Sequence, residues 1–222
     1  MTILELIAVC FGLACVALYV RQNVWSWPVG LVQVCLYVWI FFQARLYSDV
    51  LLHLVYVVLQ LYGWYVWTRP DASTSERRVT RLTPSAFAQW LLVGALSSAA
   101  LGAAMHGFTD AALPYADAAV AAFSLVAQYL LARKVLENWL VWIGVDVAAI
   151  AVYLMRGLNL TAALYAVFLC MAIAGWLAWR KSLRETTASA SGWGAVSSSA
   201  SSSPRTAATS SSSISPATPA AS

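Results

Sequence analysis

The chain is poor in charged residues and in the side-chain clusters that hold metals. Only 10% of its 222 residues are Asp, Glu, Lys or Arg, against about 25% in an ordinary soluble domain. Its two histidines, His53 and His106, lie far apart, and its cysteines include no Cys-x-x-Cys pair. These shortages exclude an ordinary soluble domain and give no sign of a metal site or a bound cofactor. We expect the cysteines, which all lie in apolar runs, to be buried as small apolar residues: Cys10, Cys15, Cys35 and Cys170.

The chain also lacks the groups that two other classes of membrane protein need. Its only lysines, Lys134 and Lys181, stand at the ends of apolar segments, so no mid-helix lysine can hold the retinal of a light sensor. Asp117 and Asp146 are carboxylates inside apolar segments, yet no nucleophile and base accompany them. We therefore expect a protein that is not an enzyme, with a membrane enzyme as a remote alternative.

Apolar residues are abundant. They make up 61% of the chain, and the mean hydropathy is +0.73, so a soluble core of this length could not hide them. Seven segments approach the ~20 residues that cross a bilayer as a helix. For the first segment, which contains Glu5, a cleaved signal peptide is the alternative. The predicted spans are residues 3–20, 25–43, 48–67, 86–106, 113–132, 138–155 and 159–179.

The basic residues predict the orientation in the membrane. With seven spans, one side holds eleven of the 13 Lys and Arg residues, and the other holds only Arg45 and Arg156. Because basic loops stay in the cytoplasm, we expect a membrane protein with its amino terminus outside and its carboxyl terminus in the cytoplasm. The net charge of +4 then belongs to the membrane face and gives no reason to expect nucleic-acid binding.

Two short motifs occur twice. Residues 23–27 (Asn-Val-Trp-Ser-Trp) return as residues 138–142 (Asn-Trp-Leu-Val-Trp), 115 positions later. Residues 63–67 (Gly-Trp-Tyr-Val-Trp) return as residues 175–179 (Gly-Trp-Leu-Ala-Trp), 112 positions later. The offset falls from 115 positions at the first motif to 112 at the second, so the sequence predicts two copies that differ by a small loop deletion. Duplicated membrane folds are common among transporters, which hold the substrate between the copies.

Two copies of three spans can share one orientation only if one extra span separates them. We predict an all-α membrane protein whose seven helices form a parallel 3+1+3 repeat about an axis along the membrane normal. Its parts are a three-helix bundle at 1–67, a cytoplasmic loop at 68–85, a linker (inverter) helix at 86–106 and a second bundle at 107–185. Residues 186–222, rich in Ser and Ala, are expected to be a disordered and dispensable cytoplasmic tail.

Polar residues recur at helical spacing inside four spans, where burial costs free energy unless they face partners or a cavity. Mixed amide, carboxylate and aromatic stripes predict a pocket for a flat, partly polar solute. The alternatives are interfacial anchoring for the tryptophans, helix capping for the asparagines and interhelical hydrogen bonds for the glutamines. The predicted substrate-binding residues are Asn23, Trp27, Tyr56, Gln60, Ser124, Gln128, Asn138, Trp139, Trp142, Asp146 and Tyr165.

The most specific run is at residues 137–146 (Glu-Asn-Trp-Leu-Val-Trp-Ile-Gly-Val-Asp). With it, the chain resembles the bacterial nicotinamide riboside transporters of the PnuC type over residues 20–180. Further matching runs are residues 27–30, 46–49, 62–64, 127–134, 156–162 and 175–176. The resemblance implies a SWEET-like fold, a homotrimer, and vitamin uptake for pyridine nucleotide biosynthesis by facilitated diffusion with alternating access. It also implies a cytoplasmic kinase that traps the riboside by phosphorylation.

Sister transporters for thiamine (PnuT type) and riboflavin share this scaffold and stay open as alternatives. Nicotinamide riboside is a flat cation with several hydroxyl groups. Trp139 and Trp142 could stack on its ring, and Asp146 could balance the charge. Thiamine is also a flat cation, so these groups do not choose between the two.

Overall fold

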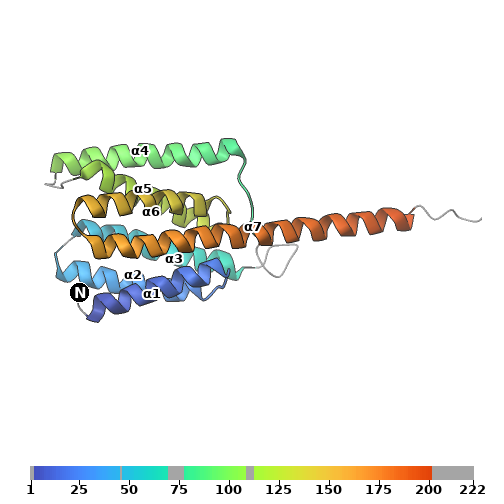
Figure 1. Ribbon diagram of the computed structural model, residues 1–222, viewed down its shortest axis with the longest axis horizontal. Coiled ribbons are helices and arrows are strands. Elements are labelled where there is room, and N and C mark those ends of the chain that lie inside the picture. Colours follow the sequence, from blue (N-terminus) through green and yellow to red (C-terminus); the bar gives the residue numbers. More distant parts are fainter. Residues whose placement is uncertain (1–2, 46, 70–77, 109–112, 202–222) are drawn as a thin grey trace, which may run out of the picture. The chain divides into compact units, whose positions relative to one another are not determined.

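Seven long helices form the part of the protein that the structure describes. The computed structural model describes residues 3–45, 47–69, 78–108 and 113–201, and within these ranges every helix is long and apolar enough to cross a membrane. The predicted all-α membrane fold with seven spans is therefore confirmed. Consecutive helices of residues 1–185 run in alternating directions (Figure 1). The helices are α1 (Ile3–Val20), α2 (Ser26–Gln43), α3 (Tyr47–Thr68), α4 (Pro84–Phe108), α5 (Pro114–Ala132), α6 (Asn138–Met155) and α7 (Asn159–Ser201).

The turns after α1 and α5 have the same backbone geometry. Gln22 and Lys134, 112 positions apart, both adopt the left-handed region, with φ of 55° and 57°. The amide of Gln22 donates to the carbonyl of Tyr19, and the amide of Lys134 donates to that of Leu131. Left-handed residues of this kind end helices by turning the chain away from the helix axis. The next helix then begins at Ser26 in one copy and at Asn138 in the other.

The turns after α2 and α6 repeat in the same way. Arg45 and Gly157 are again 112 positions apart and have φ of 59° and 71°. Helices α2 and α6 begin and end 112 positions apart as well. The described part of the chain therefore repeats α1, α2 and the start of α3 in α5, α6 and the start of α7 at one constant offset.

This offset agrees with the one predicted from the Gly-Trp-x-x-Trp motif and corrects the one predicted from the first motif. The expected pairing of Asn23 with Asn138, 115 positions apart, is wrong, because Asn23 lies in a turn whereas Asn138 is the first residue of α6. The structural counterparts are Ser26 with Asn138 and Trp27 with Trp139, with no loop deletion between the copies. The second tryptophan of α6, Trp142, produced the misleading Asn-x-x-x-Trp match.

Helix α7 continues further than expected. Its predicted span ends at residue 179, and a disordered tail was expected from 186, yet the helix runs to Ser201. Residues 186–201 contain several alanines, the residue with the highest helix propensity, and the Lys181–Glu185 pair stands one turn before them. Residues 1–185 form one compact unit and residues 186–222 another, and the expected tail beyond 201 lies outside the described residues.

The core concentrates at one end of the bundle, which we call the basic end and which is formed by the turns at 21–25 and 133–137 and by the segment 78–83. Here Gly63 and Gly175 each leave space for a tryptophan ring of the neighbouring helix. A Cβ atom at Gly63 would overlap the ring of Trp27, and one at Gly175 would come within 2.6 Å of the ring of Trp139. The same glycine–tryptophan contact thus packs α2 on α3 and α6 on α7.

The cysteines are not uniformly buried, contrary to the expectation. Cys15 is 3% exposed and donates its thiol to the carbonyl of Ser26, whereas Cys10, Cys35 and Cys170 are exposed. Apolar runs do not separate core from surface in a membrane protein, because its outer surface faces lipid and is apolar too. The exposed cysteines therefore lie on an outer surface as apolar as the core.

Replacing either glycine by alanine should destabilise the bundle. We expect Gly63→Ala and Gly175→Ala each to lower the free energy of unfolding by about 1–3 kcal/mol, because the added methyl group overpacks a tryptophan. Thermal unfolding of the purified protein in detergent measures this as a lower midpoint. The control is Gly144→Ala, where the methyl group has nothing within 4 Å. Equal midpoints for Gly63→Ala and Gly144→Ala would contradict the packing.

Candidate functional site

Four buried tryptophans meet at the basic end, and we call them the tryptophan cluster: Trp27, Trp67, Trp139 and Trp179. The ring centroids of Trp27 and Trp67 are 5.4 Å apart, and those of Trp139 and Trp179 are 5.5 Å apart. Trp67 and Trp179, at 6.0 Å, join the two pairs. Edge-to-face contacts of this kind add to the free energy gained by burial, so the cluster holds the two copies together at this end.

Reciprocal hydrogen bonds reinforce this contact. Trp67 Nε1 donates to the carbonyl of Ala132 at 3.1 Å, and Trp179 Nε1 donates to the carbonyl of Tyr19 at 3.0 Å. Both acceptors lie in the last turn of a helix, where carbonyl groups have no partner within the helix. Each copy thus caps a helix end of the other, and the bundle is closed at the basic end.

Beside the tryptophans lies a buried polar chain. The hydroxyl of Tyr19 donates to Gln60 Oε1 at 2.8 Å and accepts from Gln128 Nε2 at 3.4 Å. Gln60 and Gln128 are only 5% and 4% exposed. Three helices, α1, α3 and α5, therefore meet through one tyrosine hydroxyl, and both predicted glutamines belong to the same network.

Some buried polar atoms at this end stay unpaired. Within the described residues, no hydrogen-bond partner is found for Ser26 Oγ, Trp27 Nε1, Asn138 Oδ1 or Trp139 Nε1. These atoms form two pairs of counterparts, since Ser26 corresponds to Asn138 and Trp27 to Trp139. Buried polar groups are nearly always paired with protein or water, so unpaired ones at repeated positions mark a place where polar partners can bind.

Towards the middle of the bundle lies a second group, which we call the polar centre: Tyr56, Ser124, Asp146 and Tyr165. Tyr56 of α3 lies next to Ser124 of α5, whose hydroxyl donates to the carbonyl of Val120 at 2.6 Å. Asp146 of α6 is 4% exposed and lies close enough to Tyr165 of α7 for an electrostatic interaction. Four helices of both copies therefore contribute to one polar region around a buried carboxyl group.

Aromatic pairs occur at repeated positions, and one of them includes Tyr165 of the polar centre. The ring centroids of Phe41 and His53 are 4.9 Å apart, and those of their counterparts, Tyr153 and Tyr165, are 5.2 Å apart. The Asp146 carboxyl group breaks the repeat, because its counterpart is Val34. The two copies thus supply similar aromatic walls but different polar groups.

The structure brings most of the predicted substrate-binding residues together. Trp27, Asn138 and Trp139 join the tryptophan cluster, while Trp142 is half-buried and packs against the cores on both sides of α6. Asn23 lies apart from them. It is exposed, and its Oδ1 accepts a hydrogen bond from the amide of Trp25 at 2.9 Å within the turn.

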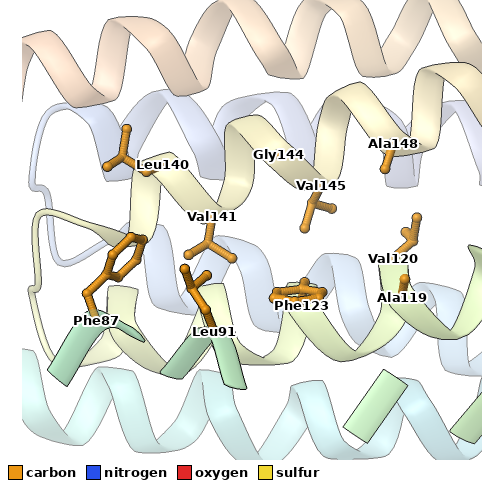
Figure 2. A pocket seen from close by; sticks show the side chains of 10 residues that line it. All are labelled: Phe87, Leu91, Ala119, Val120, Phe123, Leu140, Val141, Gly144, Val145 and Ala148. Carbon is orange, nitrogen blue, oxygen red and sulfur yellow. The ribbon is translucent and has the colours of Figure 1, made fainter. Parts of the chain in front are cut away.

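A cavity of about 330 Å³ opens between α4, α5 and α6, away from these polar groups. Figure 2 shows its wall of apolar side chains, among them Phe87 and Leu91 of α4, Phe123 of α5 and Val141 of α6. None of the predicted substrate-binding residues lines it. Without polar groups this cavity has nothing to orient a riboside.

Several residues of the site could not be identified as such from the sequence alone. Tyr19 stands in a span that repeats no motif, so nothing in the sequence marks its hydroxyl as the junction of two glutamines. Trp67 and Trp179 were visible through the repeated Gly-Trp-x-x-Trp motif, although the sequence did not distinguish a buried cluster from interfacial anchors. The carboxylate of Glu137, 7% exposed, gave no signal beyond its place in the longest matching run.

Comparison with known proteins agrees with this architecture. The profile of the family described as nicotinamide mononucleotide transporter matches residues 2–181. Nicotinamide riboside transporter PnuC of Escherichia coli is 27% identical over 207 residues, covering 82% of this chain and 87% of that protein. Riboflavin/roseoflavin transporter RibM of Streptomyces davaonensis is 26% identical over 192 residues, covering 82% of this chain and 87% of that protein.

The fold agrees as well. The crystal structure of the vitamin B3 transporter PnuC is similar with a TM-score of 0.64 and 25% sequence identity, covering 82% of this chain and 82% of that one. The resemblance inferred from residues 137–146 and the other matching runs is thereby confirmed. The match to the family profile, the relatives and the seven membrane-spanning helices show that the chain belongs to the nicotinamide mononucleotide transporter family, as a multi-pass membrane transporter of the PnuC type and not an enzyme.

Proposed function

We propose that the protein carries nicotinamide riboside across the bacterial inner membrane by facilitated diffusion. The observation that carries this proposal is the buried carboxyl group of Asp146 at the polar centre, near the aromatic pair of Tyr153 and Tyr165. A carboxylate removed from water is costly unless a cation or hydrogen-bond donors compensate it. The pyridinium ring of nicotinamide riboside supplies a cation, and its ribose supplies donors.

The neighbouring groups fit the rest of this substrate. Trp142 stands one helical turn before Asp146 and offers a flat face for stacking or a cation–π contact. Ser124 and Gln128 of α5, with Tyr56 and Gln60 of α3, offer hydroxyl and amide groups for the ribose. Two relatives named as nicotinamide riboside transporters, from Escherichia coli and Neisseria mucosa, support the same substrate.

The mechanism we propose is alternating access. Helices α1–α3 and α5–α7 act as two similar bodies in a parallel 3+1+3 repeat, and α4, which has no counterpart, restores the orientation of the second body. The basic residues favour an amino terminus outside and a cytoplasmic basic end. The closed tryptophan cluster would then be the cytoplasmic gate, with a homotrimer as the assembly and a riboside kinase trapping the product.

Riboflavin is the second candidate, because the relative RibM, named as a riboflavin/roseoflavin transporter, covers as much of the chain as PnuC of Escherichia coli does. Riboflavin carries no positive charge, so it would leave the carboxylate of Asp146 uncompensated. Thiamine, the remaining alternative, is cationic like nicotinamide riboside, so the charge of Asp146 does not distinguish the two.

Titration of the purified protein with all three vitamins tests the proposal directly. Tighter binding of riboflavin or thiamine would replace nicotinamide riboside as the proposed substrate.

Removing the ring of Trp142 should weaken binding. We expect Trp142→Ala to lower the affinity for nicotinamide riboside by about 5- to 30-fold, corresponding to the ~1–2 kcal/mol of a partly desolvated cation–π contact. Calorimetric titration of folded, monodisperse protein provides the measurement. Trp25→Ala is the matched control, since this tryptophan is 69% exposed at the basic end. Equal affinities in the two variants would remove Trp142 from the site.

Removing the charge of Asp146 should act selectively. Asp146→Asn keeps the size of the side chain but deletes its charge, so it should weaken nicotinamide riboside and thiamine by about tenfold or more and riboflavin much less. Parallel titrations with the three vitamins measure the difference. Equal weakening of all three would assign Asp146 a structural role, and an unchanged affinity would place the cation elsewhere.

Transport should need no ion gradient. Proton relays use chains of ionisable groups. Of the two acidic residues inside the spans, Asp117 is ion-paired with Arg156 at 2.5 Å. Asp146 is therefore the one acidic residue among the described residues of the polar centre. We expect equal initial uptake into liposomes with and without a proton or sodium gradient. Accumulation of unmodified riboside above the outside concentration, driven by either gradient, would overturn facilitated diffusion.

A further inference from the structure

The segment before α4 is tied to the turn between α5 and α6. The amide of Thr80 donates to the carbonyl of Lys134 at 3.0 Å, and the amide of Leu136 donates to the carbonyl of Thr80 at 2.9 Å. These two bonds form a short parallel bridge between Thr80 and Val135. The segment that follows the first copy is thus held against the basic end of the second copy by backbone hydrogen bonds.

The carboxylate of Glu137 strengthens this attachment. Its Oε2 accepts from the amide of Leu82 at 3.0 Å, and its Oε1 accepts from Arg81 Nε at 3.3 Å. The side chain of Glu137 is 7% exposed, whereas that of Arg81 is 64% exposed. Hydrogen bonds to an ionised group are stronger than those between neutral groups. A buried carboxylate that lost these bonds would be unpaired, which would raise the free energy of the folded protein.

The attachment also covers the tryptophan cluster. Val79, one residue before the bridge, is 6% exposed and belongs to the same core as Trp67, Trp139 and Trp179. Opening the basic end means separating these tryptophans, and Val79 packs in their core. The cover is therefore part of the closed state rather than a peripheral loop.

The cover breaks the repeat. The counterpart of Glu137 is Trp25, which is 69% exposed in the turn between α1 and α2. That turn has the same backbone geometry as the turn at 133–137, as the φ values of Gln22 and Lys134 show. Of the two equivalent turns, the one at 133–137 carries a buried carboxylate that binds residues 81 and 82, and the other carries an exposed indole.

We propose that residues 78–83 are a latch on the exit at the basic end, and that Glu137 is the residue that holds this latch closed. The proposal rests on the proposed function, in which the substrate leaves at this end. Detachment of the latch from Glu137 and from the turn at 133–137 accompanies opening and sets how often the exit opens. Glu137 positions the latch without touching the substrate.

Cys15 provides a native reporter of opening, because it is 3% exposed and lies in the same core as the tryptophan cluster. In a background with Cys10→Ser, Cys35→Ser and Cys170→Ser, we expect Glu137→Gln to raise the rate of Cys15 modification by a small thiol reagent about tenfold. Glu137→Ala, which also removes the acceptor for the Leu82 amide, should raise it further. Arg81→Ala should match Glu137→Gln.

The control is Trp25→Ala at the counterpart position, which should leave the rate of Cys15 modification at the wild-type value. Thermal unfolding midpoints separate opening from general loosening, and the conservative Glu137→Gln keeps the test interpretable if Glu137→Ala folds poorly. Wild-type labelling in folded Glu137→Gln and Arg81→Ala overturns the latch. The assay needs no substrate, so it stays informative even if nicotinamide riboside is not carried.

A crosslink tests the requirement for detachment. Thr80→Cys with Val135→Cys, in a background with all four native cysteines replaced by serine, places two thiols across the bridge, where opposing Cα atoms suit a disulfide. Oxidation should abolish uptake of nicotinamide riboside into liposomes, and reduction should restore it. Unchanged uptake by the oxidised, fully crosslinked protein would show that the latch does not have to open.

Discussion

The closure of the basic end depends on one reciprocal contact, in which the indole of each copy donates to a helix end of the other. Trp67 reaches Ala132, and Trp179 reaches Tyr19. Because membrane helices gain little from the hydrophobic effect once they are in lipid, directional bonds and close packing must hold the copies together. The glycines at 63 and 175 allow the close packing, and the indole groups supply the directional bonds.

From this contact inward, the site changes from aromatic to polar. Near the basic end, Tyr19 joins Gln60 and Gln128, and deeper in the bundle the carboxyl group of Asp146 lies near the aromatic pair of Tyr153 and Tyr165. A gradation of this kind suits a solute with a flat ring and a hydroxylated sugar. The apolar cavity between α4, α5 and α6 is lined by none of these polar groups.

The sequence allowed the seven helices to be predicted closely, because hydropathy and basic residues act over whole segments. Span 138–155 coincides with α6, and span 3–20 with α1. The repeat register was predicted correctly at the Gly-Trp-x-x-Trp motif but missed by three residues at the first motif, since Asn138 and Trp142 imitate the spacing of Asn23 and Trp27. The polar chain through Tyr19 and the attachment of Thr80 and Glu137 depend on contacts between distant segments, and such contacts leave no periodic pattern in a single sequence.

The four unpaired polar atoms at Ser26, Trp27, Asn138 and Trp139 have a consequence for switching speed. Each buried group without a partner raises the free energy of the closed arrangement by about 1–3 kcal/mol. A carrier turns over quickly only when its two arrangements differ by a few kcal/mol, because a deep minimum on one side would trap it there. In the alternating access proposed above, incomplete pairing at these two pairs of counterpart positions would offset part of the tryptophan contacts and keep the two arrangements close in free energy.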